Sequence, residues 1–408
     1  MGLAALLFGE GSALASGQDL FGFGARSAAL GGSSALVEGY EAAYHNPAAL
    51  GDLKRRSLAL GLVAADPALE VDGALRPGEP PVATVAGVAL PLRLLGWWEG
   101  RVGLALGLWA PTDVIVRGRI PSHGTPHLPV LEERARTIGA HLAVGFRPHE
   151  RLSVGGGVLA LAALVGRIRV RPAEGGRLTA AIDDELIADY APILGAKLEP
   201  ADHWTVGVAY RGESVAKFDV PLDIDLGDRV CIGDGLCVDA PLLGIRGTAQ
   251  YDPRQAQVDL AWRQGGLRLS LGALWRQWSL YPLRSAPPVP GSPVHEPPGF
   301  DDTLSWRAAA EWRAVDRPGW ALVTRAAGGW EPSPAPKETG TGALLDATRR
   351  TAAVGVGVAL GDGGVGTVTF DAFAMHQGLV ERTHSTTAGE LTVSGRVLVG
   401  GAQVAVLF

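Results

Sequence analysis

The feature that most constrains this chain is a series of segments, each roughly ten residues long, in which apolar and polar side chains alternate. Between Trp306 and Arg313, tryptophan and alanine fall on one face of an extended strand, while arginine, alanine and glutamate fall on the other. No continuous apolar stretch reaches the roughly 18 residues that a membrane-spanning helix needs. A bilayer would therefore admit the chain only as a closed β-barrel, in which every backbone group is paired.

The connections between these segments alternate in length. We expect strands at residues 56–64, 82–92, 101–109, 135–146, 152–161, 189–198, 204–212, 255–264, 267–279, 302–313, 319–330, 350–360, 365–376 and 391–408. Short connections at 93–100, 147–151, 199–203, 265–266, 314–318 and 361–364 alternate with long ones at 65–81, 110–134, 162–188, 213–254, 280–301, 331–349 and 377–390. Short turns on one rim and long loops on the other are typical of outer-membrane barrels, and about 14 strands is an even number, as such barrels require. Within the connection 213–254, residues 243–251 could form an extra half-strand.

Aromatic residues support the same interpretation. Trp97 and Trp98 lie in an expected turn. Five more tryptophans lie at or near expected strand ends: Trp109, Trp204, Trp278, Trp320 and Trp330. Aromatic side chains form girdles at both rims of a membrane barrel. The chain also ends in an alternating strand that closes on Phe408, as many outer-membrane barrels do.

Composition excludes several classes of function. The net charge of −6 argues against a nucleic-acid partner, which would require a basic face. The sequence carries no nucleophile elbow, phosphate-binding loop or HExxH motif, so we expect neither an enzyme nor a cofactor. We expect no metal site, because no second cysteine or histidine pair accompanies the two cysteines.

The amino-terminal region differs from the rest of the chain. Residues 1–15 end in Ala-Leu-Ala and indicate a short, truncated signal peptide, although the usual positive region is missing. Residues 16–54 are rich in glycine, alanine and serine, with a turn signal at Asn46-Pro47. A segment of this length is too short to fold alone but can fill a barrel lumen. We therefore expect a hatch at 16–54 inside a transmembrane barrel at 55–408. The run Gly155–Gly157 predicts a strand kink or a close backbone approach.

The run GARSAALGGSSALVEGYEAAYHNPAAL resembles the amino-terminal hatch of the FadL-type outer-membrane transporters for long-chain fatty acids and aromatic hydrocarbons, and Asn46-Pro47-Ala48 matches the hatch motif. Residues 300–313, 330–336 and 344–350 resemble later segments of that family. The resemblance implies a 14-stranded monomeric barrel with a hatch, which takes a hydrophobic ligand from outside and releases it laterally or through the hatch. The departures are the loop of Cys231 and Cys237, the weak signal peptide, and Leu304-Ser305, where the family more often has an aromatic residue.

Three residues are candidates for ligand binding. Arg276 and Arg307 are expected nearly opposite each other on the lumen face of neighbouring strands, where they would hold a carboxylate by paired hydrogen bonds. Leu274 would supply an apolar contact. The alternative is that these arginines belong to a lumen salt-bridge network with Glu311, Asp259 and the hatch residue Arg26. For gating, the resemblance points to movement of Asn46, Pro47 and Ala48.

The two cysteines, Cys231 and Cys237, lie in the longest expected outer loop. In an oxidising compartment they would form a small disulfide, and otherwise they would be two free thiols.

These observations predict an outer-membrane protein of a Gram-negative bacterium that takes up hydrophobic small molecules by passive, ligand-gated diffusion. Its partners would be that ligand and the outer-membrane lipids. The alternative is a plugged barrel that serves as a structural, secretion or surface-anchoring partner. An open porin is disfavoured by the hatch, and an array of soluble β-sandwiches by the connections.

Overall fold

The computed structural model describes residues 17–76, 80–92, 96–112, 126–128, 137–173, 177–224, 230–232, 236–238, 243–281, 299–340, 343–361 and 366–408. Its wall is a closed antiparallel barrel of 14 strands, and all fourteen expected strands are confirmed. In chain order the wall strands are β1 (Ser57–Val71), β3 (Val82–Leu92), β4 (Val102–Pro111), β5 (Gly139–His149), β6 (Leu152–Ala173), β7 (Arg177–Ala201), β8 (Trp204–Arg211), β13 (Gln255–Gln264), β14 (Leu267–Arg276), β15 (Thr303–Arg317), β16 (Trp320–Glu331), β18 (Arg349–Leu360), β19 (Thr367–Thr386) and β20 (Gly389–Leu407). Each strand pairs with the next, β8 pairs with β13, and β1 pairs with β20 to close the barrel.

The wall presents apolar side chains outward and smaller ones inward. In β1, Leu58, Leu60 and Leu62 are more than half exposed, whereas Ala59 and Val63 are buried against the lumen contents. An apolar outer face around a closed barrel suits the hydrocarbon of a bilayer. Among the described residues, no helix is long and apolar enough to cross a membrane.

The tryptophans divide into two groups. Trp98, Trp204, Trp320 and Trp330 are exposed near strand ends, as a girdle requires. The girdle prediction was wrong for Trp109 and Trp278, which are almost fully buried. Trp109 is one of the inward-facing residues of β4. Trp278 follows β14 in the 3₁₀ turn η5 (Trp278–Leu280), and this turn directs its side chain into a buried aromatic cluster.

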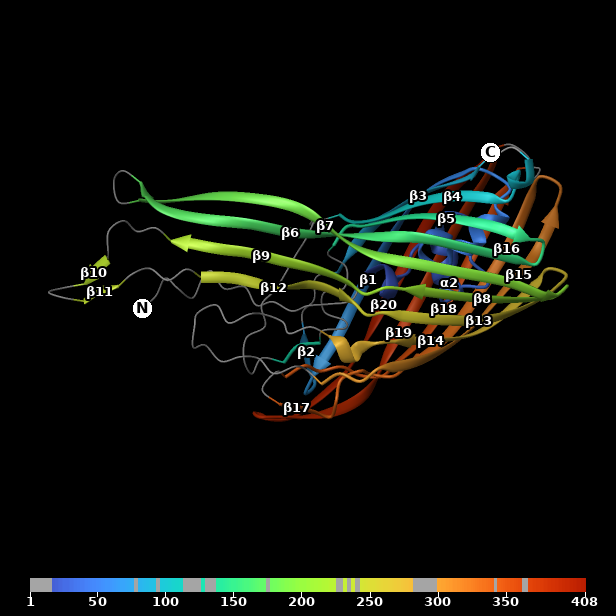
Figure 1. Cartoon of the computed structure of the whole chain (residues 1–408). Coiled ribbons are helices and arrows are strands. Elements are labelled where there is room, and N and C mark those ends of the chain that lie inside the picture. The colour runs from blue at the N-terminus through green and yellow to red at the C-terminus, as the bar shows by residue number, and fades with distance from the viewer. Residues whose placement is uncertain are drawn as a thin grey trace.

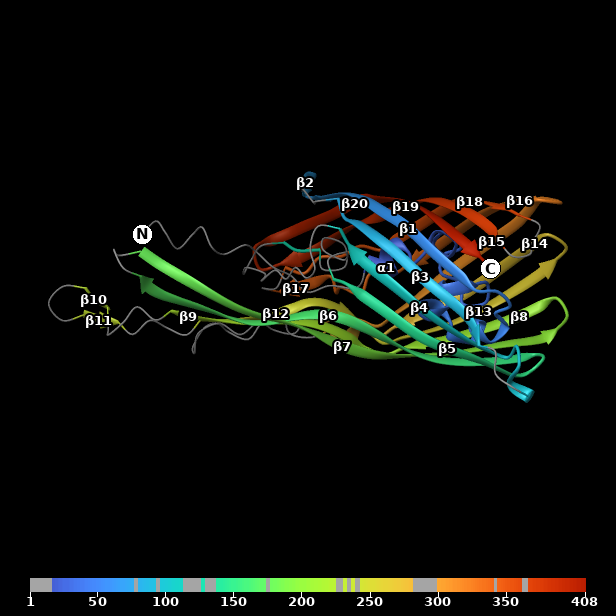
Figure 2. The same ribbon diagram turned by 90° about the horizontal axis from the view of Figure 1, so that it is seen from above.

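The outer end of the barrel carries an extension that the sequence did not reveal (Figures 1 and 2). The expected loop at 162–188 is wrong, because β6 and β7 continue as one hairpin far beyond the wall. Inside the expected loop 213–254, β9 (Ser214–Ile224) pairs with β12 (Leu243–Asp252), and β9 lies parallel to β6. The expected half-strand at 243–251 is thus confirmed. Continued pairing satisfies backbone groups that a bare loop would leave to water.

Smaller elements complete the outer end and the turns. The loop expected at 377–390 is also wrong, because β19 and β20 continue almost to their shared turn. Outside the wall lie β2 (Ala74–Arg76), β10 (Val230–Ile232), β11 (Leu236–Val238), β17 (Glu338–Gly340) and the 3₁₀ turn η4 (Gly96–Trp98).

The segment before β1 lies inside the barrel (Figure 1). We call residues 17–54 the hatch. It contains the helices α1 (Gly17–Phe21), α2 (Ala25–Ala29) and α3 (Ala42–His45) and the 3₁₀ turns η2 (Gly39–Glu41) and η3 (Pro47–Asp52). Most hatch side chains are buried, and they share one hydrophobic core with inward residues of the wall. The expected signal peptide at 1–15 lies outside the described residues.

Candidate ligand passage

One half of the wall holds the hatch through glycines. A side chain at any of these positions would come within 3.0 Å of a hatch atom. They are Gly87, Gly103, Gly107, Gly145, Gly155, Gly195 and Gly207, on strands β3 to β8. Gly155 therefore marks a close approach, as the glycine run predicted. We call this set the glycine cradle. Close packing of this kind leaves no room for a ligand where these glycines meet the hatch.

The predicted gating residues lie in the glycine cradle. Asn46 is fully buried, and its side-chain nitrogen donates to the carbonyl oxygens of Ser34 at 3.0 Å and Ala196 at 3.1 Å. Its side-chain oxygen accepts from the Ala48 amide at 3.1 Å and so caps η3, where Pro47 takes the first position. These contacts make Asn46 an anchor of the hatch. Movement of this segment during release remains a prediction.

The other half of the wall leaves space beside the hatch. An outer cavity of about 130 Å³ lies between the hatch and strands β8 and β13–β19. An inner cavity of about 720 Å³ lies towards the short turns, between the hatch and strands β13–β20 and β1. On β16 the two cavities are separated only by the step from Arg325 to Ala327, roughly 7 Å along a strand.

Helix α2 lies between the two cavities. A side chain at Gly355 would come within 2.5 Å of Ala29, so the helix rests directly on the backbone of β18. Glycines with positive φ flank the helix: Gly22 and Gly24 precede it, and Gly31 and Gly32 follow it. Besides its alanine contacts, this five-residue helix is held by the side chain of Arg26 and by the backbone amides of Ala25 and Ser27, which donate to Gln403 at 3.3 Å and to Glu41 at 2.9 Å.

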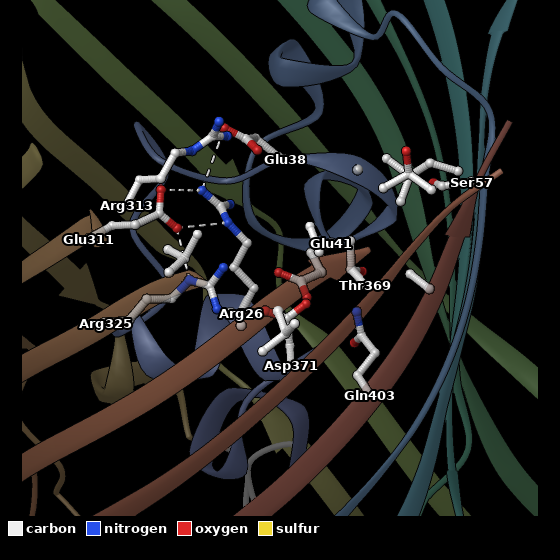
Figure 3. A pocket seen from close by; sticks show the side chains of 18 of the residues that line it. Arg26, Glu38, Glu41, Ser57, Glu311, Arg313, Arg325, Thr369, Asp371 and Gln403 are labelled. Atoms are coloured by element: carbon white, nitrogen blue, oxygen red, sulfur yellow. Dashed lines mark hydrogen bonds and ion pairs between the residues drawn. The ribbon is translucent and has the colours of Figure 1, made fainter. Parts of the chain in front are cut away.

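Arg26 fixes α2 to the wall by a bidentate ion pair. Its guanidinium donates to both carboxylate oxygens of Glu311 at 3.1 Å and to the carbonyl oxygen of Leu36 at 2.7 Å. Arg325 donates to Glu311 at 2.8 Å and to Asp371 at 2.6 Å, which extends the network across the wall (Figure 3). These charges form the ceiling of the inner cavity.

Glu41 is a second buried acid at this ceiling. It accepts from the Ser27 amide at 2.9 Å and points to the same space as Asp371 (Figure 3). Burial raises the pKa of Glu41 to about 7, against an opposing contribution from Arg26, and the nearby Asp371 raises it further. The protonation of this hatch residue therefore changes near neutral pH.

The three predicted ligand-binding residues all line the outer cavity. The expected register of Arg276 and Arg307 is wrong, however, because the two do not lie opposite each other. Arg276 pairs with Thr303, and Arg307 pairs with Gly272, so the two arginines lie roughly 13 Å apart along the strands. A long connection does not fix the register of two strands as a short turn does, so the pattern of inward and outward faces sets it here.

Both arginines have acidic partners. Arg307 holds Asp259 through two hydrogen bonds at 3.1 and 3.2 Å and donates to the Gly31 carbonyl at 2.9 Å. Arg276 donates to Asp19 at 2.7 Å and lies 3.0 Å from Glu331. Of the network that the sequence left as an alternative, the pairs Arg307–Asp259 and Arg26–Glu311 are present, whereas Arg276 pairs with Asp19 and Glu331 instead.

Sequence reasoning missed several residues around the outer cavity. Asp19 comes from the hatch helix α1, while Arg211 and Arg349 sit at the outer ends of β8 and β18. Alternation could have found Arg211, since it shares a face with Gly207 and Ala209. Asp19 gave no signal, because hatch residues follow no strand period.

The chain is similar to known proteins in its fold and not in its sequence. No family model matches the chain, and no curated relative matches it. A Pseudomonas aeruginosa FadL homologue superposes with a TM-score of 0.61 at 17% identity, covering 92% of this chain and 95% of its own. The chain has the FadL-type fold.

Two further structures agree with the FadL-type fold. The Pseudomonas putida toluene transporter TodX superposes with a TM-score of 0.56 at 13% identity, covering 97% of this chain and 99% of its own. The Ralstonia pickettii toluene transporter TbuX gives 0.51 at 17% identity, covering 94% and 98%. At these identities the likeness establishes the barrel and the hatch, and the function has to be inferred from this chain's own lumen.

Proposed function

We propose that this protein lets hydrophobic small molecules, such as long-chain fatty acids, cross the outer membrane of a Gram-negative bacterium passively. One observation carries the proposal: two cavities lie in line on the same side of the hatch, one towards each end of the lumen. The structural neighbours are a FadL homologue and toluene transporters, which supports the same class of cargo. Nothing in this passage requires catalysis, a cofactor or a second subunit, so a monomer suffices.

The outer cavity suits a molecule with an apolar part. Leu20, Leu274 and Met375 line it together with several alanines, and Arg211 and Arg276 reach it from the outer ends of β8 and β14. Burying an apolar tail here stabilises the complex by about 25 cal/mol per Å² of surface removed from water. That gain would favour capture from dilute solution without an energy source.

Passage between the cavities requires α2 to move away from β18. The ion pair of Arg26 with Glu311 would open as it moves, and the glycine cradle would keep the rest of the hatch in place. We thus assign gating to α2, with Asn46 as the fixed point, in place of the movement of Asn46, Pro47 and Ala48 that the resemblance implied.

The test begins with ligand retention and transport. Detergent-purified protein is analysed by native mass spectrometry and organic extraction, and cells that produce it are assayed for uptake of a labelled long-chain fatty acid. We expect a bound hydrophobic molecule and uptake above that of cells lacking the protein. An empty barrel without uptake would refute the proposal.

A reversible lock tests the role of α2. The hydroxyl oxygens of Ser33 and Ser270 lie 2.8 Å apart, just after α2, so the pair Ser33→Cys/Ser270→Cys can bridge hatch and β14. In a Cys231→Ser/Cys237→Ser background, oxidation should stop uptake and reduction should restore it. The matched pair Asp52→Cys/Ser153→Cys bridges the cradle side, where the side chains are 3.2 Å apart, and should leave uptake unchanged. Unchanged uptake in the first oxidised pair would show that α2 need not move.

A second candidate function is surface interaction or anchoring, and the extension favours it. Strands β6, β7, β9 and β12 project well beyond the wall, which a passage alone does not need (Figure 1). Replacing residues 216–249 with a short linker should abolish retention of a co-purifying protein partner in this case, while fatty-acid uptake persists.

A further inference from the structure

A carboxylate of the hatch occupies an arginine site at the outer cavity. Asp19, on α1, accepts from Arg211 at 2.8 Å and from Arg276 at 2.7 Å. The Tyr44 hydroxyl donates to the same carboxylate at 3.1 Å, and Arg211 stacks over the Tyr44 ring at 3.8 Å. Two arginines and a hydroxyl around one carboxylate are the contacts that an anionic ligand head group would seek.

The site has more positive than negative charge. Arg276 also pairs with Glu331, which pairs in turn with Arg349. Among these described residues, three arginines face two carboxylates, which leaves one excess positive charge. All three arginines are more than nine-tenths buried. A buried charge without a full set of partners costs free energy that an added anion would recover.

Several donors of the same arginines have no acceptor. Within the described part of the chain, Nη1 of Arg211, Nε of Arg276 and Nη1 of Arg349 are buried without a hydrogen-bond partner. Arg211 and Arg276 line the outer cavity, so an acceptor that enters the cavity comes within their reach.

The nearby histidine adds no positive charge. His45 lines the same cavity, and burial together with the charges of Arg211 and Arg307 lowers the pKa of His45 well below its usual range. The imidazole is neutral at pH 7, so the field at the site comes from the arginines.

We propose that the outer cavity binds the carboxylate of an amphipathic ligand at Arg211 and Arg276, and that Asp19 is an internal mimic which this ligand displaces. The inference rests on the proposed passage and names the head group of its cargo. An incoming carboxylate takes over the donors that hold Asp19, and α1 loses its ion pairs to β8 and β14.

Displacement of Asp19 would loosen only part of the hatch. Gly22 follows α1 with a φ of +97°, which lets the helix swing without strain in a side-chain-bearing residue. The Asn46 side chain is bonded to Ser34 within the hatch and to Ala196 on β7, and these contacts do not involve Asp19. Head-group binding is thereby coupled to the outer part of the hatch while the glycine cradle stays closed.

The experiment compares two probes with the same tail, hexadecanoate and hexadecanol, by equilibrium binding to the detergent-purified protein at fixed chloride concentration. In Asp19→Asn the competing carboxylate is gone, so hexadecanoate should bind about tenfold more tightly while hexadecanol binds as before. In Arg276→Gln hexadecanoate should bind about tenfold to a hundredfold more weakly, again with hexadecanol unchanged. The control Arg151→Gln removes an exposed arginine in the short turn between β5 and β6, outside both cavities, and should change neither affinity.

The outcomes separate the two proposals. Heat-modifiable mobility in detergent gels first confirms that each variant keeps a folded barrel. If both probes bind equally and neither variant changes them, or if both probes shift together, the carboxylate site is overturned and the passage for hydrophobic molecules stands. If the folded protein binds neither probe, both proposals fail.

Discussion

Replacing Asn46 by alanine should weaken the attachment of the hatch without harming the wall. The change removes three hydrogen bonds, two donated to Ser34 and Ala196 and one accepted from Ala48. At about 0.5–1.5 kcal/mol each, the loss amounts to about 1.5–4.5 kcal/mol. The fraction of molecules with the hatch locally open should then rise about tenfold to a thousandfold.

Hydrogen–deuterium exchange with mass spectrometry measures this fraction directly. Peptides from residues 17–54 should exchange faster in Asn46→Ala by that factor, while wall peptides keep their protection. Ser33→Ala is the control, since it removes only the hydroxyl contact with Ser270 and should give an acceleration of about fivefold. If hatch exchange in a folded Asn46→Ala barrel equals that of the unmodified protein, Asn46 is not an anchor and the reasoning from its buried contacts is refuted.

Three further predictions concern neighbouring features. Gly155→Ala places a methyl group 2.4 Å from Pro47 and should raise ion conductance in planar bilayers. In the control Gly156→Ala the new methyl group lies 3.7 Å from its nearest neighbour, so this variant should stay closed. Equal conductance of the two variants would contradict the close packing of the hatch on the glycine cradle. Burial raises the pKa of Glu41 to about 7 from an ordinary 4.5, so its contribution to hatch stability is full below pH 4.5 and is lost as the pH rises to 7. Hydrogen exchange of the hatch, measured from pH 5 to 8, should show this loss of stability in the unmodified protein and not in Glu41→Gln. Cys231 and Cys237 are directly paired residues of the β10–β11 hairpin, a spacing that suits a disulfide, so alkylation followed by mass spectrometry should label them only after reduction; labelling of the unreduced protein would show free thiols.

The wall could be predicted from the sequence because its physics is local. A strand with one face towards lipid and one towards the lumen imposes a period of two, and each turn or loop interrupts that period. Even Leu274, a single inward position of β14, was placed correctly on the lumen side. The extension was missed because 162–188 was interpreted as a long outer loop, although Arg167–Arg171 alternates apolar and charged residues as a strand does.

The ligand passage could be predicted only in part. The arginines were found because charge inside an apolar barrel is conspicuous, but their partners depend on register and on the hatch. Asp19 and Arg276 are 257 residues apart, and no local pattern links them. The glycine cradle could not be predicted either, because glycine occurs in strands for many reasons. Only the packed hatch shows which of the strand glycines contact it.

The two halves of the lumen differ in a way that decides where a molecule can pass. Along β3–β8 the hatch rests on the glycine cradle, with ion pairs of Asp52 to Arg147 and Lys197 beside it, and a ligand that entered there would have to break close packing for which it offers no replacement. Along β13–β20 the contacts are ion pairs at the edges of cavities, and a polar head group or water can take the place of either partner. Opening the second half therefore costs less free energy than opening the first, even if both bury similar areas. The division between a glycine half and an arginine half is what allows one short segment to close the barrel and still let cargo move past it.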